Sequence, residues 1–273
     1  MVMYCVIWLI EYIFYMKKIF KSSVLRSDDP MLDKVKVNFN ESVDKAVYPF
    51  TLPIIKNLTD IEFKTPVTFF VGENGSGKST ILETIAYLAG FNLEGGSVNM
   101  QFKTAGEGCY ASIEKLAEHL TLSWKRKPRD GYFFRAESFF NVASYIESIG
   151  VSGYGDKSLH HQSHGESFMS FFQNRLGSKG GFFIFDEPEA SLSPQRQLSL
   201  LVMIHEMCKN SDAQFIIATH SPILLGYPNS TIYSCDSGTL EKISYTDTDH
   251  YMITKEFLNN PEQFLHRLFT DEQ

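Results

Sequence analysis

The chain has 273 residues, of which 43% are hydrophobic and 14% aromatic, and its formal net charge is −7 at pH 7. This composition predicts a globular chain of one large or two small domains, and it argues against intrinsic disorder, collagen-like repeats and polytopic membrane architecture. The acidic balance also argues against a protein that coats nucleic acid by bulk charge, although a local basic patch stays open. The four scattered cysteines show neither a C-x-x-C pair nor zinc-ligand spacing, which is typical of reduced thiols in a cytoplasmic protein.

Residues 1–30 form an apolar extension that Glu11 interrupts. A membrane-spanning helix needs about 20 mostly apolar residues, and a secretory signal begins with basic residues, so the extension fits neither. Three interpretations stay open: a helix that binds a partner or a membrane surface, a buried helix, or upstream sequence translated from an early start codon. Met16 and Met31 are alternative starts, and every interpretable motif follows Met31. The extension is therefore a candidate dispensable segment, and residues 31–273 are expected to form one domain.

The elements expected after Met31 alternate between strands and helices. Apolar or alternating runs predict strands at Lys34–Phe39, Val67–Val71, Gly181–Phe185 and Gln214–Thr219. Helical spacing of apolar residues predicts helices at Ser79–Leu88 and Leu198–Cys208. A small hairpin is expected from Ile232–Ser234 and Leu240–Ile243. A strand, a helix and a second strand in that order form a crossover unit, which predicts a parallel sheet with helices on its faces.

Residues 72–79 read G-E-N-G-S-G-K-S, a full match to the P-loop pattern between a predicted strand and a predicted helix. Glycines let backbone N–H groups wrap a phosphate at the positive end of the helix. In such a loop Lys78 reaches the β- and γ-phosphates, and the Ser79 hydroxyl ligates Mg²⁺. The motif predicts that the chain binds a nucleoside triphosphate through Gly72, Glu73, Asn74, Gly75, Ser76, Gly77, Lys78, Ser79 and Thr80.

The apolar run at Gly181–Phe185 ends in Asp186 and Glu187. A parallel strand that ends in two carboxylates delivers them to the carboxyl edge of the sheet, beside the P-loop. Asp186 is suited to hold Mg²⁺ through water, and Glu187 is suited to polarise the attacking water as a general base.

These residues resemble the motifs of ABC-type ATPases. In that family the acid pair is followed by a D-loop, here Ser191–Pro194, and then by a switch histidine, here His220 within Thr219–Pro222. A signature sequence, usually L-S-G-G-Q or L-S-G-G-E, precedes the acid pair, and Gln162–Ser167 occupies its place. The likeness implies nucleotide contacts from Ser163, Gly165 and Glu166. Gln162 and His164 depart from the pattern, which weakens the case for an ordinary membrane transporter.

The chain resembles more closely the compact, soluble ABC ATPases related to the ATPase heads of DNA-repair and chromosome-maintenance proteins, a group known as predicted AAA or ABC-like ATPases. The similar segments are Phe69–Val71, Arg135–Asn141, Gln162–Phe168, Asp186–Gln197 and Phe215–Leu225. The resemblance implies an α/β P-loop NTPase fold of the ABC type, with a largely parallel central sheet, helices on both faces and a small antiparallel subdomain. A helical and signature insertion is expected around residues 91–180, without the heptads of a coiled-coil arm.

The resemblance also implies a mechanism. Two copies would pair head to tail, so that Ser163 and Gly165 of one face the γ-phosphate held by the other, and ATP with Mg²⁺ would stabilise the closed homodimer. Glu187, His220 and Lys78 would be the catalytic residues. The expected role is a cytoplasmic switch or motor in DNA repair or defence, with DNA or an effector protein as partner and without stable membrane association. The alternatives are the ATPase subunit of a membrane transporter and a nucleotide-gated binding module.

Some assignments stay open. The coupling glutamine of ABC proteins has two candidate equivalents, Gln101 and Glu137. His160, His161 and His164 form an H-H-x-x-H cluster that lacks the further ligands of a metal site, so metal binding is not favoured.

A short basic stretch is the remaining candidate for contact with nucleic acid. Lys125–Arg129 lies between Trp124 and Tyr132, whose rings would be available for base stacking. The alternative is a solvated loop, which is the commoner fate of such stretches.

Overall fold

The computed structural model describes residues 29–40, 43–98, 107–137 and 180–270. The proposed signature at Gln162–Ser167, the candidate Gln101, the histidines at 160, 161 and 164, and nearly all of the N-terminal extension lie outside these ranges.

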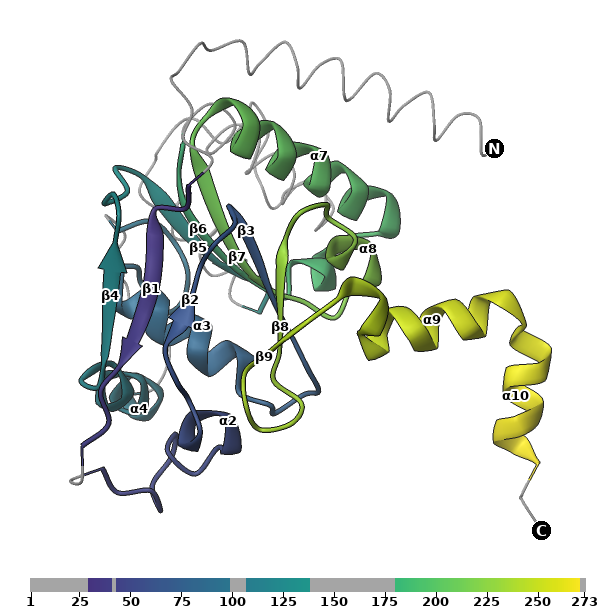
Figure 1. The fold of residues 1–273 in the computed structure, drawn as a ribbon, viewed down its shortest axis with the longest axis horizontal. Helices are drawn as coiled ribbons and strands as arrows, with labels where there is room; N and C mark the ends of the chain where they lie inside the picture. The colour runs from purple at the N-terminus through teal and green to yellow at the C-terminus, as the bar shows by residue number, and fades with distance from the viewer. Residues whose placement is uncertain (1–28, 41–42, 99–106, 138–179, 271–273) are drawn as a thin grey trace.

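The main sheet has six strands in the order β5-β6-β7-β3-β8-β9 (Figure 1). The strands are β3 (Val67–Val71), β5 (Gly131–Arg135), β6 (Gly181–Asp186), β7 (Ala213–Ala218), β8 (Thr231–Ser234) and β9 (Glu241–Ile243). Each neighbouring pair from β5 to β8 is parallel, and β9 alone runs antiparallel, to β8. The predicted hairpin is thus confirmed, and it forms one end of the largely parallel central sheet.

Alternate residues of the central strands enter two different cores. On one face, helix α7 (Pro194–Asn210) and the short helix α8 (Pro222–Leu225) pack against Phe183, Phe185, Phe215 and Ile217. Phe182 and Ile216 face the opposite side, where α3 (Lys78–Leu88) lies. Because both faces are covered, these strands are almost wholly apolar, which is why the sequence predicted them.

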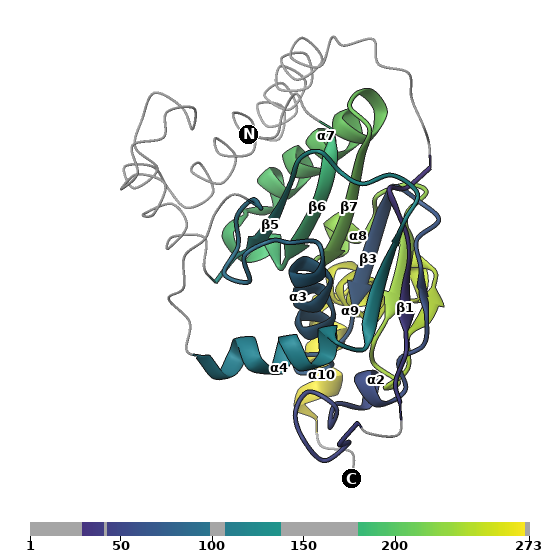
Figure 2. The same ribbon diagram turned by 90° about the vertical axis from the view of Figure 1, so that its left-hand side faces the viewer.

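A second sheet covers the α3 side of the molecule (Figure 2). Its antiparallel strands are ordered β2-β1-β4 and comprise β1 (Leu32–Val37), β2 (Ile61–Glu62) and β4 (Leu120–Trp124), with α2 (Pro53–Lys56) and α4 (Glu107–Ala117) nearby. This is the small antiparallel subdomain implied by the resemblance. The range 91–180 therefore supplies strands β4 and β5 to the two sheets, as well as helix α4.

Helix α7 is longer than the predicted Leu198–Cys208 at its N-terminal end. It begins at Pro194, directly after the N-cap Ser193. Proline is favoured in a first helical turn, where its missing N–H leaves no hydrogen bond unmade.

The chain continues beyond the hairpin as a C-terminal arm, which the sequence analysis did not predict. A 3₁₀ turn at Tyr245–Asp247 leads into α9 (Asp249–Asn259) and α10 (Pro261–Phe269). Figure 1 shows these two helices extending away from the sheets, and neither contains a buried residue. Within the described ranges, no helix is both long and apolar enough to span a lipid bilayer.

One buried side chain joins the two sheets. The amide of Gln214, on β7, is 1% exposed; its Oε1 accepts a hydrogen bond from the Leu32 N–H at 2.7 Å and its Nε2 donates to the Leu32 carbonyl at 3.1 Å. Both hydrogen bonds lie between β1 of the small sheet and β7 of the main sheet.

We expect Gln214→Ala to lower the free energy of unfolding by about 3 kcal/mol, because it leaves two buried backbone groups without partners. Chemical denaturation of the variant and the parent measures this difference. The matched control is Gln263→Ala on the exposed face of α10, expected to change stability by less than about 0.5 kcal/mol. Equal losses in the two variants would show that Gln214 does not join the sheets.

Candidate functional site

The glycine-rich loop joins the end of β3 to the start of α3. Its last glycine, Gly77, has φ +94° and precedes the first helical residue, Lys78. A Cβ atom at Gly77 would lie 2.5 Å from Cγ2 of Ile54, so glycine is required there by backbone angle and by space.

Lys78 closes this loop from inside. Its Nζ donates to the carbonyl of Gly72 at 2.7 Å and to that of Glu73 at 3.0 Å, and the side chain is nearly buried. The hydroxyl of Ser76 is also buried and has no hydrogen-bond partner among the described residues. A buried ammonium, an unpaired hydroxyl and a helix N-terminus form a donor set that fits a phosphate chain.

Asp236 holds the loop from the neighbouring strand end. Its Oδ1 accepts from the backbone N–H of Glu73 at 2.7 Å, and its Oδ2 accepts from Ser234 Oγ at 3.0 Å. Sequence reasoning treated Asp236 only as part of a hairpin turn. β3 and β8 are parallel neighbours, so the residues that follow them lie side by side. A prediction of this pairing would have placed Asp236 beside the P-loop.

The structure places Ser79 and Asp186 together. Ser79 Oγ donates to Asp186 Oδ1 at 3.1 Å, and burial raises the pKa of Asp186 to about 7. A hydroxyl and a carboxylate with space for phosphate oxygens and water fit Mg²⁺, a hard cation that prefers oxygen ligands. The adjoining cavity of about 330 Å³ is lined by Ser79, Arg135, Ala136, Glu137, Asp186, Glu187, Ala190 and Ser191.

Arg135, at the end of β5, supplies positive charge to this edge. Its Nη1 lies 2.8 Å from Oε1 of Glu83, whose pKa is raised by burial, and its Nε lies 3.8 Å from Asp186 Oδ2. The side chain of Glu137 is 84% exposed and lies 3.4 Å from Arg135 Nη2. Glu137, one of the two candidates for the coupling position, thus lines the cavity, whereas Gln101 is outside the described residues.

Glu187 has an unusual backbone conformation. Its φ of 52° and ψ of 52° place it in the left-handed region, which costs a residue with a side chain about 1–2 kcal/mol. Its N–H donates to the Ala218 carbonyl at 3.0 Å, which fixes this geometry against β7. The side chain is 40% exposed, so its carboxylate is accessible to water.

His220, which follows β7, faces Glu187. The ring Nε2 lies 3.4 Å from Glu187 Oε1, and Nδ1 lies 3.0 Å from Nε2 of His250. Glu189 accepts a hydrogen bond from the His220 backbone N–H at 2.5 Å. Burial, together with the Lys78 ammonium, lowers the pKa of His220, so the ring is neutral at pH 7.

Several predicted site residues therefore meet at the carboxyl edge of the parallel strands, namely Lys78, Ser79, Asp186, Glu187 and His220. Their catalytic roles stay predictions, as do those of Ser163, Gly165 and Glu166, which lie outside the described residues. Sequence reasoning missed Asp236, Glu189 and His250, each of which contacts a site residue 30 or more positions away along the chain.

Sequence reasoning also missed Tyr48. Its ring is 50% exposed, and its hydroxyl lies 3.2 Å from Thr80 Oγ1, in the first turn after the P-loop. Exposed aromatic side chains are common on protein surfaces, so the sequence alone does not mark Tyr48 as a candidate site residue. Its position beside the first turn of α3 does.

The structure contradicts base stacking for one of the two rings beside the basic stretch. Tyr132 is 1% exposed and is not available to a base, whereas Trp124 is half-buried and packs edge-on against Phe182, with 5.0 Å between ring centroids. Lys125 lies within 3.6 Å of Asp29 and Asp33, and Arg126 pairs with Asp212. These carboxylates offset much of the local positive charge.

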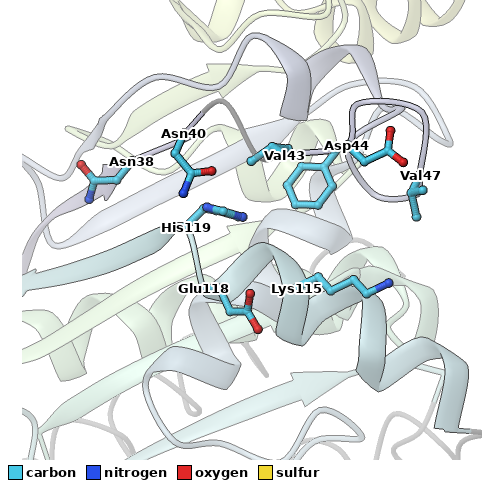
Figure 3. Close-up of a pocket in the computed structure, with 9 residues that line it drawn as sticks. Asn38, Asn40, Val43, Asp44, Val47, Lys115, Glu118 and His119 are labelled. Carbon is cyan, nitrogen blue, oxygen red and sulfur yellow. The ribbon is translucent and has the colours of Figure 1, made fainter.

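A larger cavity lies away from this site. It has a volume of about 550 Å³, and its lining residues are Asn38, Asn40, Val43, Asp44, Val47, Phe50, Lys115, Glu118 and His119 (Figure 3). None of the predicted site residues that the structure describes lines it. In the part of the chain that the structure describes, no group of three or more His, Cys, Asp and Glu side chains could hold a metal ion.

Two family models match the chain on either side of the proposed signature. One, described as "AAA domain", covers residues 49–139, which include the P-loop. The other, "AAA domain, putative AbiEii toxin, Type IV TA system", covers residues 168–226, which include the acid pair and His220. Together the two matches contain every predicted site residue except Ser163, Gly165 and Glu166.

Curated relatives extend the same likeness. The "Putative ABC transporter ATP-binding protein GSU3001" of Geobacter sulfurreducens is 26% identical over 66% of this chain and 69% of its own length. The "Putative ABC transporter ATP-binding protein MTBMA_c05830" of Methanothermobacter marburgensis is 30% identical, over 36% of this chain and about a third (35%) of its own length. The "Zinc import ATP-binding protein ZnuC" of Marinobacter nauticus is 22% identical over 70% of this chain and 74% of its own length.

One solved structure, cbiO1 from Clostridium perfringens, "part of the ABC transporter complex cbiONQ", aligns over 89% of this chain and 100% of that chain. Its TM-score is 0.45 and its identity is 19%.

We expect Glu187→Gly to be more stable than Glu187→Ala by about 1 kcal/mol, because only glycine relieves the left-handed backbone while both remove the carboxylate. Denaturant unfolding of the two variants measures the difference. The control pair is Glu256→Gly and Glu256→Ala within exposed α9, where the order should reverse because glycine disfavours a helix. The same order at both positions would contradict the backbone assignment of Glu187.

Proposed function

We propose that this chain, an ABC-type P-loop ATPase, binds ATP with Mg²⁺ and hydrolyses the ATP at a site shared between two copies of the chain. The observation that supports the proposal best is the convergence of Lys78, Asp186, Glu187 and His220 at one sheet edge. Each of these residues offers a different chemical group: a cation, a metal-binding carboxylate, an accessible base and a neutral imidazole.

The residues act on the nucleotide in distinct ways. When bound, ATP supplies the phosphoryl group that passes to water, and Mg²⁺ offsets its negative charge. Lys78, which now donates to two loop carbonyls, would redirect its N–H groups to the phosphate chain. Ser79 Oγ and Asp186 Oδ1 would hold the metal, and a metal ion would give the buried Asp186 carboxylate the countercharge that favours its ionised form.

Glu187 is the proposed general base. Its carboxylate is 40% exposed and faces the cavity beside Asp186, so it can accept a proton from a water molecule there. His220 Nε2, 3.4 Å from that carboxylate, lies on the same side and can donate a hydrogen bond to the terminal phosphate.

The second copy is proposed because Glu187 and Ser191 line a cavity of about 330 Å³ that the described residues leave unfilled. In the ABC family the signature of a partner closes this side, and Ser163, Gly165 and Glu166 would do so here. ATP would then stabilise the dimer, since contacts from both copies to the γ-phosphate exist only in the closed pair. Hydrolysis would release the two copies.

We further propose Tyr48 as the contact for the nucleobase. Its exposed ring lies at the N-terminal end of α3, where its hydroxyl hydrogen-bonds to Thr80. A flat aromatic ring next to a phosphate site suits a purine, because the base can stack on the ring without hydrogen bonds to its edge.

A second candidate is the ATP-binding subunit of a membrane transporter. The relatives from Geobacter, Methanothermobacter and Marinobacter carry transporter names, which favours it. A role in DNA repair or defence draws on the resemblance to repair-type ATPases, and the paired charges of Lys125 and Arg126 give it no added support.

We expect Glu187→Gln to lower ATP turnover by about 10²–10⁴-fold while nucleotide affinity stays close to that of the parent, because only the proton acceptor is lost. Phosphate release and binding of a fluorescent ATP analogue measure the two quantities. Lys78→Ala serves as the comparison variant, with both affinity and turnover expected to fall. Parental turnover in Glu187→Gln would remove Glu187 from the mechanism.

The two candidate roles differ in what stimulates turnover. If the chain serves DNA, linear duplex DNA at low salt should raise the ATPase rate, and the rise should vanish in Lys78→Ala. If it serves a transporter, DNA should have no effect, and a chain trapped with ATP by Glu187→Gln should retain a membrane-protein partner in a pull-down. Slow turnover with tight ATP-dependent capture of a soluble protein would instead favour the nucleotide-gated binding module.

A further inference from the structure

His250 contacts the ring of His220 from a part of the chain that carries no nucleotide motif. Its Nε2 lies 3.0 Å from His220 Nδ1, and the two ring centroids are 5.1 Å apart at an interplanar angle of 55°. The residue belongs to the first turn of α9, at the base of the C-terminal arm. This is a hydrogen bond between imidazoles, so one nitrogen must donate and the other accept.

A further contact fixes the base of the arm to the segment Thr219–Pro222, which follows β7. The hydroxyl of Tyr245 donates to the Pro222 carbonyl at 2.9 Å, two residues beyond His220. Thr248 is 1% exposed and caps α9, where its Oγ1 accepts from the Tyr251 N–H. His250 is therefore presented to His220 from a well-anchored helix start, whereas the rest of α9 contains no buried residue.

The number of protons on the two rings determines which tautomers His220 can adopt. Burial is the main cause that lowers the pKa of both rings, so each is neutral at pH 7 and carries one N–H. If His250 donates from Nε2, then His220 Nδ1 accepts and the proton of His220 is on Nε2. If His220 donates from Nδ1, its Nε2 presents a lone pair to the Glu187 carboxylate 3.4 Å away, which is repulsive.

The surroundings of His220 favour the first arrangement. Nε2 of His220 makes no hydrogen bond within the described residues and lies on the side of Glu187. An N–H there can donate to a phosphoryl oxygen, whereas a lone pair there would repel it.

We infer that His250 is a positioning residue, which holds His220 as the Nε2–H tautomer and so directs a hydrogen-bond donor toward the terminal phosphate. The inference rests on the proposed ATPase function. His250 itself does not touch the nucleotide in this arrangement, and acts only through His220 Nδ1.

The test compares His250→Ala, His250→Gln and the control His266→Ala, in which an exposed histidine of α10 is removed from the same arm. We expect His250→Ala to lower kcat for ATP by about 10-fold with KM unchanged, the scale found when the hydrogen-bond partner of a functional histidine is lost. His250→Gln should recover part of the rate, because its amide N–H can donate to Nδ1. His266→Ala should match the parent.

A second readout follows the tautomer directly. Long-range ¹H–¹⁵N spectra of the histidine-labelled chain distinguish the two tautomers, and His220→Gln identifies the His220 signals. The parent should show Nε2–H, and His250→Ala should show a mixture. Nδ1–H in the parent overturns the inference, even if His250→Ala fails to fold.

The outcomes separate the inference from the function on which it rests. A parent with no ATP turnover above that of Lys78→Ala refutes the proposed ATPase function, while the spectra still decide the tautomer. A parent that hydrolyses ATP, with His250→Ala equal to His266→Ala in kcat, overturns the role of His250. A raised KM with unchanged kcat also overturns it, because a tautomer directed at the terminal phosphate should affect turnover.

Discussion

The site depends on four parallel strands that end at a common edge of the main sheet. Val71 of β3 pairs with Ser234 of β8, and Phe70 of β3 pairs with Ala218 of β7, which in turn pairs with Asp186 of β6. This register places the P-loop, the acid pair, His220 and Asp236 at or directly after neighbouring strand ends. The apolar packing on both faces fixes the register, because a shift of one residue would turn every buried side chain to the opposite face.

The same burial places carboxyl groups at the edge in surroundings that disfavour their charged forms. Glu83 and Asp186 are buried and Glu189 is half-buried, and loss of solvent raises the pKa of all three. Arg135 and Lys78 supply the nearby positive charges, but Lys78 is directed at loop carbonyls rather than at the acids. An edge of this kind favours a cation beside Asp186, and a phosphate chain beside Lys78 then completes the charge balance.

The sequence predicted the elements whose residues meet local demands. A strand buried on both faces must be a continuous apolar run, and a phosphate loop must have glycine where Gly77 approaches Ile54, so β3, β6, β7 and the P-loop were all evident. The contacts of Asp236, Glu189 and His250 were not, because each joins residues 30 or more positions apart through the fold. The ion pair of Arg126 was not evident for the same reason, since Asp212, its partner, is 86 residues away.

The contact between His220 and His250 gives the exposed arm a physical connection to the nucleotide edge. His220 is held on three sides, by Glu189 at its backbone, by Glu187 beside Nε2 and by His250 at Nδ1. The same base of the arm is held by the Tyr245 hydroxyl, which donates to the Pro222 carbonyl at 2.9 Å, and by the buried Thr248 at the N-cap of α9. Beyond this base, α9 and α10 contain no buried residue. The contact with His220 therefore comes from the anchored start of α9, and the exposed remainder of the arm takes no part in it.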